Sequence, residues 1–180
     1  MKNVVIVGAT GAVGQEMIRC LEELEFPVGT LRLAASERSA GKKVQTKFGE
    51  IEIEVISEKV FEESDFALFS AGSDISKEWR ERVVAANCLM IDNSSAFRNE
   101  EDVPLVVPQI NAEAARTHKG VISNPNCTTA IAAVALWPLH QKFGLKKIIM
   151  STYQATSGAG AKGMQELIDQ TGEVLQKCNG

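Results

Sequence analysis

A glycine-rich turn between a strand and a helix constrains this chain more than any other feature. Residues 4–7 form a continuous run of β-branched side chains, which is typical of a parallel strand buried on both faces. The segment GATGAVG (residues 8–14) follows at once, and apolar residues then recur at helical spacing between 15 and 24. In a turn between a strand and a helix, glycines let the backbone come close to a pyrophosphate. The N–H groups at the start of the helix then bind its negative charge. This succession predicts a dinucleotide site, and the alternative is a tight turn that binds nothing.

The rest of the chain alternates apolar runs with helical stretches such as residues 75–86. This alternation predicts a doubly wound, Rossmann-type α/β fold with a mainly parallel sheet. Ser70 and Gly72 follow one of the runs, at the end of a strand where open α/β sheets bind ligands. Residues 44–55 alternate apolar and polar around a glycine and predict a half-exposed antiparallel edge hairpin. The other strands are expected at 31–36, 66–69, 88–92, 105–108 and 121–123.

The loop after the second strand bears on the choice of nicotinamide cofactor. Glu37 is compatible with NAD, because an acidic residue there binds the ribose 2′-hydroxyl. Arg38, Ser39 and Lys42 instead make a cationic, hydrogen-bonding loop that suits a 2′-phosphate. The arginine favours NADP(H), and the alternative is a solvated charged turn.

Charge and cysteine usage exclude several classes of protein. The net charge of −4 over 180 residues argues against a basic nucleic-acid footprint. No apolar run approaches the length of a membrane span, and the N-terminus does not resemble a signal peptide. The four cysteines lie far apart, and His118 and His140 lack a partner at metal-ligand spacing, so we expect no metal and a reducing cytoplasm. Cys20 lies among apolar residues and is predicted to belong to the core.

Cys127 stands in the run SNPNCTT (residues 123–129), in which turn-forming residues precede a predicted helix. The residue before a proline is pushed out of the α region, and Asn126 can then cap a helix that begins at or just after Cys127. A thiol at a helix N-terminus feels the positive end of the macrodipole, which lowers its pKa and favours the nucleophilic thiolate. The alternative is a buried structural cysteine.

The whole chain resembles the aspartate-semialdehyde dehydrogenase family, whose motifs it carries in order. The matching segments are GATGAVG, ASERSAGK, FSAGSDIS, DNSSAFR, SNPNCTT and STYQATSGAGAKGM. The resemblance implies conversion of L-aspartyl 4-phosphate and NADPH to L-aspartate 4-semialdehyde, phosphate and NADP. This is a step towards lysine, threonine and methionine, and in bacteria towards diaminopimelate.

The resemblance also implies a role for individual residues. Cys127 would attack the acyl phosphate and form a thioester, Arg98 would grip the substrate phosphate, and Gln154 would position the acyl group. Ser157 and Gly158 would touch the nicotinamide end of the cofactor. The remaining cofactor contacts implied by the family and by the strand ends are Gly8, Thr10, Gly11, Ala12, Val13, Arg38, Ser39, Ser70 and Gly72.

Family members are longer than this chain, and their catalytic histidine and carboxylate-binding residues come after the equivalent of Gly180. We therefore expect an NADP-binding domain at 1–126 and part of a catalytic and dimerisation domain at 127–180, cut short at its end. In the second domain, helices are expected at 128–143 and 162–177 with a strand at 147–154. The resemblance implies a homodimer or homotetramer in the longer form.

Two alternatives to this activity stay open. Without the histidine, the chain could be an NADP-binding fragment that does not turn over, since a positioned base typically contributes about 10²–10⁴-fold in rate. A related acyl-phosphate reductase, such as the acylglutamyl-phosphate reductase, is the other alternative. That family usually has a glycine before and a tyrosine after the nucleophile, and Asn126 and Thr128 here argue against it.

Overall fold

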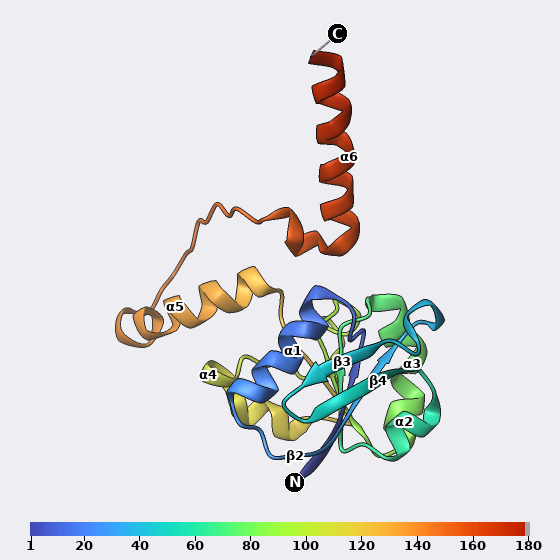
Figure 1. The fold of residues 1–180 in the computed structure, drawn as a ribbon. Helices are drawn as coiled ribbons and strands as arrows, with labels where there is room; N and C mark the ends of the chain where they lie inside the picture. The colour runs from blue at the N-terminus through green and yellow to red at the C-terminus, as the bar shows by residue number, and fades with distance from the viewer. Residues whose placement is uncertain (179–180) are drawn as a thin grey trace. The chain divides into compact units, whose positions relative to one another are not determined.

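The computed structural model describes residues 1–178, and its central feature is a seven-stranded sheet in the order β3-β4-β2-β1-β5-β6-β7 (Figure 1). Every neighbouring pair of strands is parallel except β3 and β4, which form the predicted antiparallel hairpin. The predicted doubly wound, mainly parallel fold is confirmed. The strands are β1 (Lys2–Val7), β2 (Val28–Ala35), β3 (Lys43–Thr46), β4 (Gly49–Val55), β5 (Phe66–Phe69), β6 (Leu89–Asp92) and β7 (Val121–Ser123).

Helices cover both faces of the sheet, with α1 on one side and α2 and α3 on the other (Figure 1). The α-helices are α1 (Ala12–Glu23), α2 (Glu58–Glu62), α3 (Ser73–Ala85), α4 (Pro108–Asn111), α5 (Cys127–Phe143) and α6 (Gly160–Cys178). Short 3-10 helices are η1 (Glu37–Ser39), η2 (Ala112–Thr117) and η3 (Thr156–Ala159).

The core is divided by β1, whose side chains point alternately to the two faces of the sheet. Val5 and Val7 pack in one cluster with Trp79 of α3, and Val4 and Ile6 pack in the other with the side chains of α1 and β2. Residues 4–7 are each 1% exposed or less, which confirms a strand buried on both faces.

The register of the sheet aligns the carboxyl ends of its central strands. Val7 pairs with Phe69, Phe69 with Asp92, and Asp92 with Ser123. The loops that follow these four strands therefore begin at the same level, where ligands bind in open α/β sheets.

The chain divides into two compact units, Met1–Lys146 and the part from Lys147 onward, and each is described by itself. In the second unit, α6 packs on η3, where a Cβ on Gly163 would lie 2.8 Å from Cβ of Ala159. The strand predicted at 147–154 is wrong, because these residues form no strand. A strand needs a partner for its backbone groups, and the segment makes no ladder with the described residues. The predicted domain boundary at 126/127 stays a prediction.

Two further predictions are corrected in the first unit. The run at 105–108 forms a single bridge from Leu105 to Ser123 rather than a strand, and Pro108 begins α4, a position that suits a residue without an N–H donor. Cys20 is exposed and does not belong to the core. The buried face of α1 holds Ile18, and two residues along a helix correspond to a rotation of about 200°, so Cys20 lies on the opposite side.

The two histidines lie at the surface, and neither belongs to a metal-binding cluster among the described residues. His118 and His140 are both exposed; Nδ1 of His118 accepts a hydrogen bond from the Gly120 N–H, and His140 stacks on Trp137. Within residues 1–178, no group of three or more His, Cys, Asp or Glu side chains is arranged to hold a metal ion. No helix in that range has the length and apolar content needed to cross a membrane.

Candidate active site

The glycine turn after β1 allows backbone segments to approach more closely than any side chain would permit. Gly8 has φ = +87°, and a Cβ there would lie 2.4 Å from the Ser70 carbonyl oxygen. A Cβ on Gly14 would lie 2.4 Å from the Gly8 carbonyl oxygen. Both positions therefore require glycine, and the turn brings together α1, the end of β1 and the loop after β5.

A hollow of about 320 Å³ opens beside this turn. Its walls are Val7, Gly8, Thr10, Gly11, Ala35, Ser36, Ile56, Ser70, Ala71 and Ile75. Gly11 is the N-cap of α1 and supplies no side-chain hydrogen bond to the helix, and Ala12 and Val13 form the exposed first turn. A helix N-terminus facing a glycine-lined hollow fits the pyrophosphate of a dinucleotide. Of the predicted cofactor residues, Gly8, Thr10, Gly11 and Ser70 line the hollow.

The other predicted cofactor residues of the first unit lie in the loops next to the hollow. Arg38 and Ser39 belong to η1, directly after Ala35 and Ser36, and the Ser39 N–H donates to the Ser36 carbonyl oxygen at 2.8 Å. The Arg38 side chain is exposed. Gly72 has φ = +94° and is the N-cap of α3. None of these three is a lining residue of the hollow.

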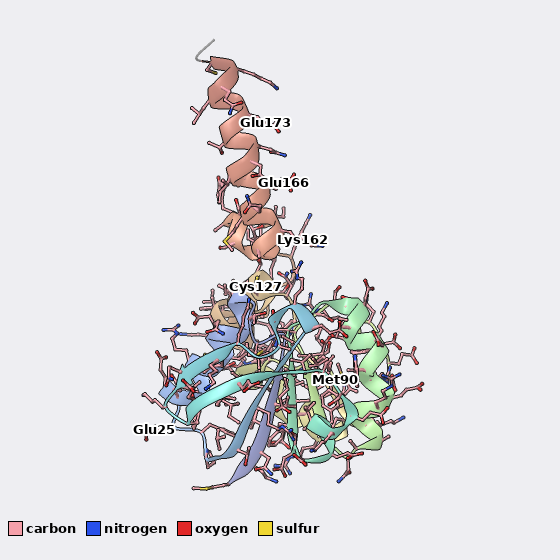
Figure 2. The ribbon with its side chains drawn as sticks, turned by 45° about the vertical axis from the view of Figure 1, so that its right-hand side comes forward. Glu25, Met90, Cys127, Lys162, Glu166 and Glu173 are labelled. Carbon is pink, nitrogen blue, oxygen red and sulfur yellow. The ribbon has the colours of Figure 1, made fainter. Side chains whose placement is uncertain are left out.

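Cys127 is the first residue of α5 and is exposed, at the upper end of the first unit in Figure 2. The Asn126 side chain caps the helix, because its Oδ1 accepts from the Thr128 N–H at 3.0 Å. The predicted cap is thus confirmed, and the alternative of a buried structural cysteine is wrong. The Cys127 Sγ lies 3.9 Å from the Thr128 Oγ1.

Arg98 connects two of the loops at the carboxyl edge. Its Nε donates to the Asn124 carbonyl oxygen at 3.0 Å, and its Nη2 donates to the Asn93 carbonyl oxygen at 2.9 Å. Nδ2 of Asn124 donates to Oδ1 of Asn93 at 2.5 Å. The guanidinium group is therefore held against the turn that leads into Cys127, with two of its five N–H donors used in these bonds.

Gln154, Ser157 and Gly158 lie in the second unit and are exposed. There the Gly158 N–H donates to the Ala155 carbonyl oxygen at 2.8 Å within η3. A Cβ on Gly158 would come within 2.5 Å of Cδ of Gln154, so the glutamine side chain lies against the glycine backbone. The unit thus brings together two residues of one motif to which different roles were assigned.

Sequence reasoning did not single out Asn93 and Asn124 as parts of the site. Both follow directly after the end of a strand, within the motifs DNSSAFR and SNPNCTT. Side chains just beyond neighbouring parallel strands meet at one edge of the sheet, and this position was the signal that could have identified them.

Comparison with known protein families identifies this arrangement. Residues 3–118 match the semialdehyde dehydrogenase NAD binding domain, and residues 136–179 match the semialdehyde dehydrogenase dimerisation domain. The chain belongs to the semialdehyde dehydrogenase family. The first of these matches confirms a nicotinamide nucleotide as the class of cofactor, and the glycine cradle and hollow of the first unit fit it.

Individual family members bear out the resemblance seen in the motifs. The chain is 47% identical to the aspartate-semialdehyde dehydrogenase of Synechocystis sp. over 97% of its own length and 52% of the relative. Aspartate semialdehyde dehydrogenase II of Vibrio cholerae, solved in complex with ASA, has a TM-score of 0.92 and 42% identity over 98% of this chain and 53% of that one. The Candida albicans enzyme, solved with NADP, has a TM-score of 0.65 and 30% identity over 81% of this chain and 48% of that one. This chain spans about half the length of these relatives.

Proposed function

We propose that the protein containing this chain converts L-aspartyl 4-phosphate to L-aspartate 4-semialdehyde and phosphate, with NADPH as the reductant. The observation that carries the proposal is an exposed thiol at the start of α5, preceded by a turn to which Arg98 is bonded. The Vibrio cholerae relative in complex with ASA and the Candida albicans relative with NADP support the choice of substrate and cofactor. The product would feed lysine, threonine, methionine and diaminopimelate biosynthesis.

The chemistry begins at Cys127. The thiolate attacks the carbonyl carbon of the acyl phosphate, a C–S bond forms, and the C–O bond to phosphate breaks. Arg98 offers its remaining N–H donors to the phosphate, for which a guanidinium fork is well suited. Gln154 positions the acyl group. When the acyl carbon has been reduced, the C–S bond breaks and Cys127 regains its thiolate.

The cofactor would be held mainly by the backbone of the first unit. Gly8 and Gly11 allow close approach of the pyrophosphate, and Ala12 and Val13 at the start of α1 present their N–H groups to it. Ser70 lines the hollow of the first unit, and Gly72 follows in the same loop, so both would contact the cofactor there. Ser157 and Gly158 of the second unit are proposed to contact its nicotinamide end. NADPH supplies a hydride when bound.

A pair of cysteine variants tests the proposed nucleophile. Cys127 and Cys20 are both exposed thiols, one at the site and one on α1. In the native protein, Cys127→Ala should lower the rate of NADPH oxidation with aspartyl phosphate by about 10⁴-fold or more, because removal of a nucleophile eliminates the covalent route. Cys20→Ala should leave the rate unchanged. Activity that survives Cys127→Ala contradicts the assignment.

Selection of NADPH over NADH is proposed to depend on Arg38 and Ser39. Because a charge-assisted hydrogen bond contributes about 1.5–3 kcal/mol, Arg38→Ala should raise the Kd of NADPH by roughly 10- to 100-fold. The Kd of NADH should change little. Arg116→Ala is the matched control, because this exposed arginine pairs with Glu113 of the same short helix, outside the proposed site. Calorimetric titration measures both constants, and equal weakening of the two cofactors refutes the 2′-phosphate assignment.

We further propose that the native protein is a homodimer or homotetramer. The match of residues 136–179 to a dimerisation domain supports this. Within that range, large apolar side chains are exposed on both helices, including Leu139, Phe143, Leu167 and Ile168. Light scattering coupled to gel filtration measures the mass, and a monomer at micromolar concentration contradicts the proposal.

A further inference from the structure

Asp92 is a buried acidic side chain that the reaction described above does not use. It is the last residue of β6 and is 0% exposed. Its Oδ1 accepts from the Ser76 hydroxyl at 2.6 Å, and its Oδ2 accepts from the Ser94 hydroxyl at 2.7 Å. The two serines come from α3 and from the loop after β6. A buried carboxyl group is costly unless it is hydrogen-bonded, so this pairing is a defined part of the fold.

The two serines extend from Asp92 into both halves of the site. Ser94 also accepts from the Ala96 N–H at 3.0 Å, which fixes the turn that leads to Arg98. The Ser76 hydroxyl also lies 3.1 Å from the Gly72 carbonyl oxygen, at the end of the loop that begins with Ser70. Through Ser94, the carboxyl group is therefore linked to residues 93–98, here called the arginine loop. Through Ser76, it is linked to residues 70–72, here called the cofactor loop.

The backbone of Asp92 makes a third connection. Its carbonyl oxygen accepts from the Asn124 N–H at 2.8 Å, in the turn that leads into Cys127. Asn93, the next residue, accepts through its carbonyl oxygen from Arg98 and through its side chain from Asn124. The arginine loop and the cysteine turn thus meet at Asp92 and Asn93.

A third hydroxyl lies on the same face of the sheet. Ser123 is in register with Asp92 on the neighbouring strand, so both side chains leave the sheet on one side. Ser123 is 0% exposed, and its Oγ makes no hydrogen bond within residues 1–178. Two serines therefore bond the buried carboxyl group, and the buried hydroxyl of Ser123 lies on the neighbouring strand on the same face of the sheet.

We propose that Asp92 is a positioning residue, which sets the loop of Arg98 relative to the turn of Cys127 without touching substrate or cofactor. This inference rests on the proposed function for its kinetic consequence. Ser76 keeps its bond to the Gly72 carbonyl oxygen when the carboxyl group is lost, whereas the turn before Arg98 loses its link to the sheet through Ser94. The loss therefore weakens the binding of phosphate by Arg98 more than the binding of the nucleotide. The geometric part, that Asp92 orders both loops, is independent of the reaction.

The kinetic test uses the native protein and the reverse reaction, in which phosphate is a substrate. Asp92→Asn keeps the size of the side chain but leaves one acceptor oxygen for two hydroxyls. Because an unsatisfied buried group costs about 1–3 kcal/mol, the KM for phosphate should rise roughly tenfold or more while the Kd of NADP changes less than about threefold. Ser64→Ala is the matched control, since the hydroxyl of this buried serine donates to the Val60 carbonyl oxygen, away from the loops of the site.

A double-mutant cycle with Arg98→Lys separates positioning from a general loss of stability. If Asp92 acts through Arg98, Asp92→Asn should have a much smaller effect on the KM for phosphate once Arg98 has been replaced. Equal effects in both backgrounds overturn the proposal. So does a rise in the KM for phosphate that is matched by the Kd of NADP, or no rise at all.

Hydrogen exchange provides a readout that needs no activity. The Ala96 N–H donates to the Ser94 hydroxyl, and the Asn124 N–H donates to the Asp92 carbonyl oxygen. Asp92→Asn should therefore speed the exchange of both amides, whereas Ser64→Ala should not.

Ser94→Ala should speed exchange at Ala96 and serves if Asp92→Asn fails to fold. Unchanged exchange at both amides refutes the positioning role. An inactive wild-type protein with the expected exchange pattern refutes the proposed function alone.

Discussion

The sheet and the helices from Cys127 onward carry similar apolar side chains but bury them differently. Residues 4–7 of β1 are almost completely buried, whereas no residue of α5 or α6 is buried. The sheet is covered by α1 on one face and by α2 and α3 on the other, so its core is completed within the first unit. On α5, Ile131 is 72% exposed and Phe143 is 68% exposed. The nucleotide-binding part therefore draws its stability from contacts within the chain, whereas both helices leave large apolar side chains exposed.

Cys127 lies where the well-buried part of the chain passes into the exposed helix α5. The turn before it is fixed by the sheet, through Asp92, Asn93 and Arg98, while the helix that begins with it contains no buried residue. The thiol is thus placed by the part of the molecule that holds the cofactor. We infer that the geometry of the nucleophile depends on the sheet more than on α5.

The largest expected effect compares one phenylalanine from each region. Phe69 is 0% exposed and stacks on Phe61 with ring centroids 5.9 Å apart. Phe69→Ala should lower the free energy of unfolding by about 3–5 kcal/mol, because it removes buried apolar surface and leaves a cavity. Phe143→Ala should change it by less than about 0.5 kcal/mol. Urea unfolding followed by circular dichroism measures both, and similar losses would break the comparison.

The next effect compares two glycines with positive φ. Gly8→Ala combines the strain of φ = +87° with a contact of 2.4 Å to the Ser70 carbonyl oxygen, and should cost roughly 2–4 kcal/mol. It should also abolish nucleotide binding, because the loops move apart. Gly160 has φ = +80° and open space around its Cβ position, so Gly160→Ala should cost about 1 kcal/mol and leave binding intact. Equal costs for the two variants would contradict the close approach at Gly8.

These contrasts show which parts of the fold the sequence could predict. The strand, glycine turn and α1 were predictable because their signals lie within 24 consecutive residues. The strand predicted at 147–154 failed because an apolar run shows only that a segment can pair, and its partner is not among the described residues. Cys20 was misplaced because its apolar neighbours Ile18 and Leu21 face a different side of α1.

The candidate site also has some contacts that the sequence could predict and others that it could not. The Asn126 cap of α5 could be predicted because donor and acceptor are two residues apart. The bonds of Arg98 could not, because its acceptors are backbone carbonyl oxygens, which every residue has, and Asn124 is 26 residues away. Asp92 was read as the end of a strand, and only the fold shows that serines from α3 and from the next loop converge on it.

A third prediction compares the thiols of the two regions by their chemistry. Burial raises the pKa of Cys88 from an ordinary value of 9.0 to about 12, with a smaller contribution from the charge of Asp65. At pH 8, iodoacetamide should therefore modify Cys127 within minutes and leave Cys88 unmodified until the protein unfolds. Mass spectrometry of the peptides separates the two sites. Early modification of Cys88 would show that the sheet opens far more readily than its burial indicates.

The same shift predicts how stability responds to alkaline pH. The raised pKa favours the neutral thiol in the folded state, so its contribution is fully present below pH 9 and is lost as the pH rises towards 12. Cys88→Ala should reduce this loss relative to the wild type. Urea unfolding at pH 8 and pH 10.5 measures the difference, and an equal loss in both proteins would assign the effect to other groups.

The smallest expected effect compares two aspartates, the half-buried Asp65 and the exposed Asp169. Asp65 accepts from the Lys2 side chain and from the Asn3 N–H, both at 2.8 Å, and these bonds hold its pKa below the ordinary value. Its contribution is present above the unfolded pKa and is lost as the pH falls through the folded pKa, so Asp65→Asn should matter at pH 7 and not at pH 2. Asp169 on α6 accepts only from the neighbouring Gln165 side chain, and Asp169→Asn should have no effect on unfolding at either pH. Thermal unfolding of the two variants at both pH values tests this.

Asp65 joins the start of β1 to the start of β5. A pH-dependent loss of stability in Asp65→Asn alone would show that even surface contacts of the sheet stabilise the fold, whereas those of α6 do not.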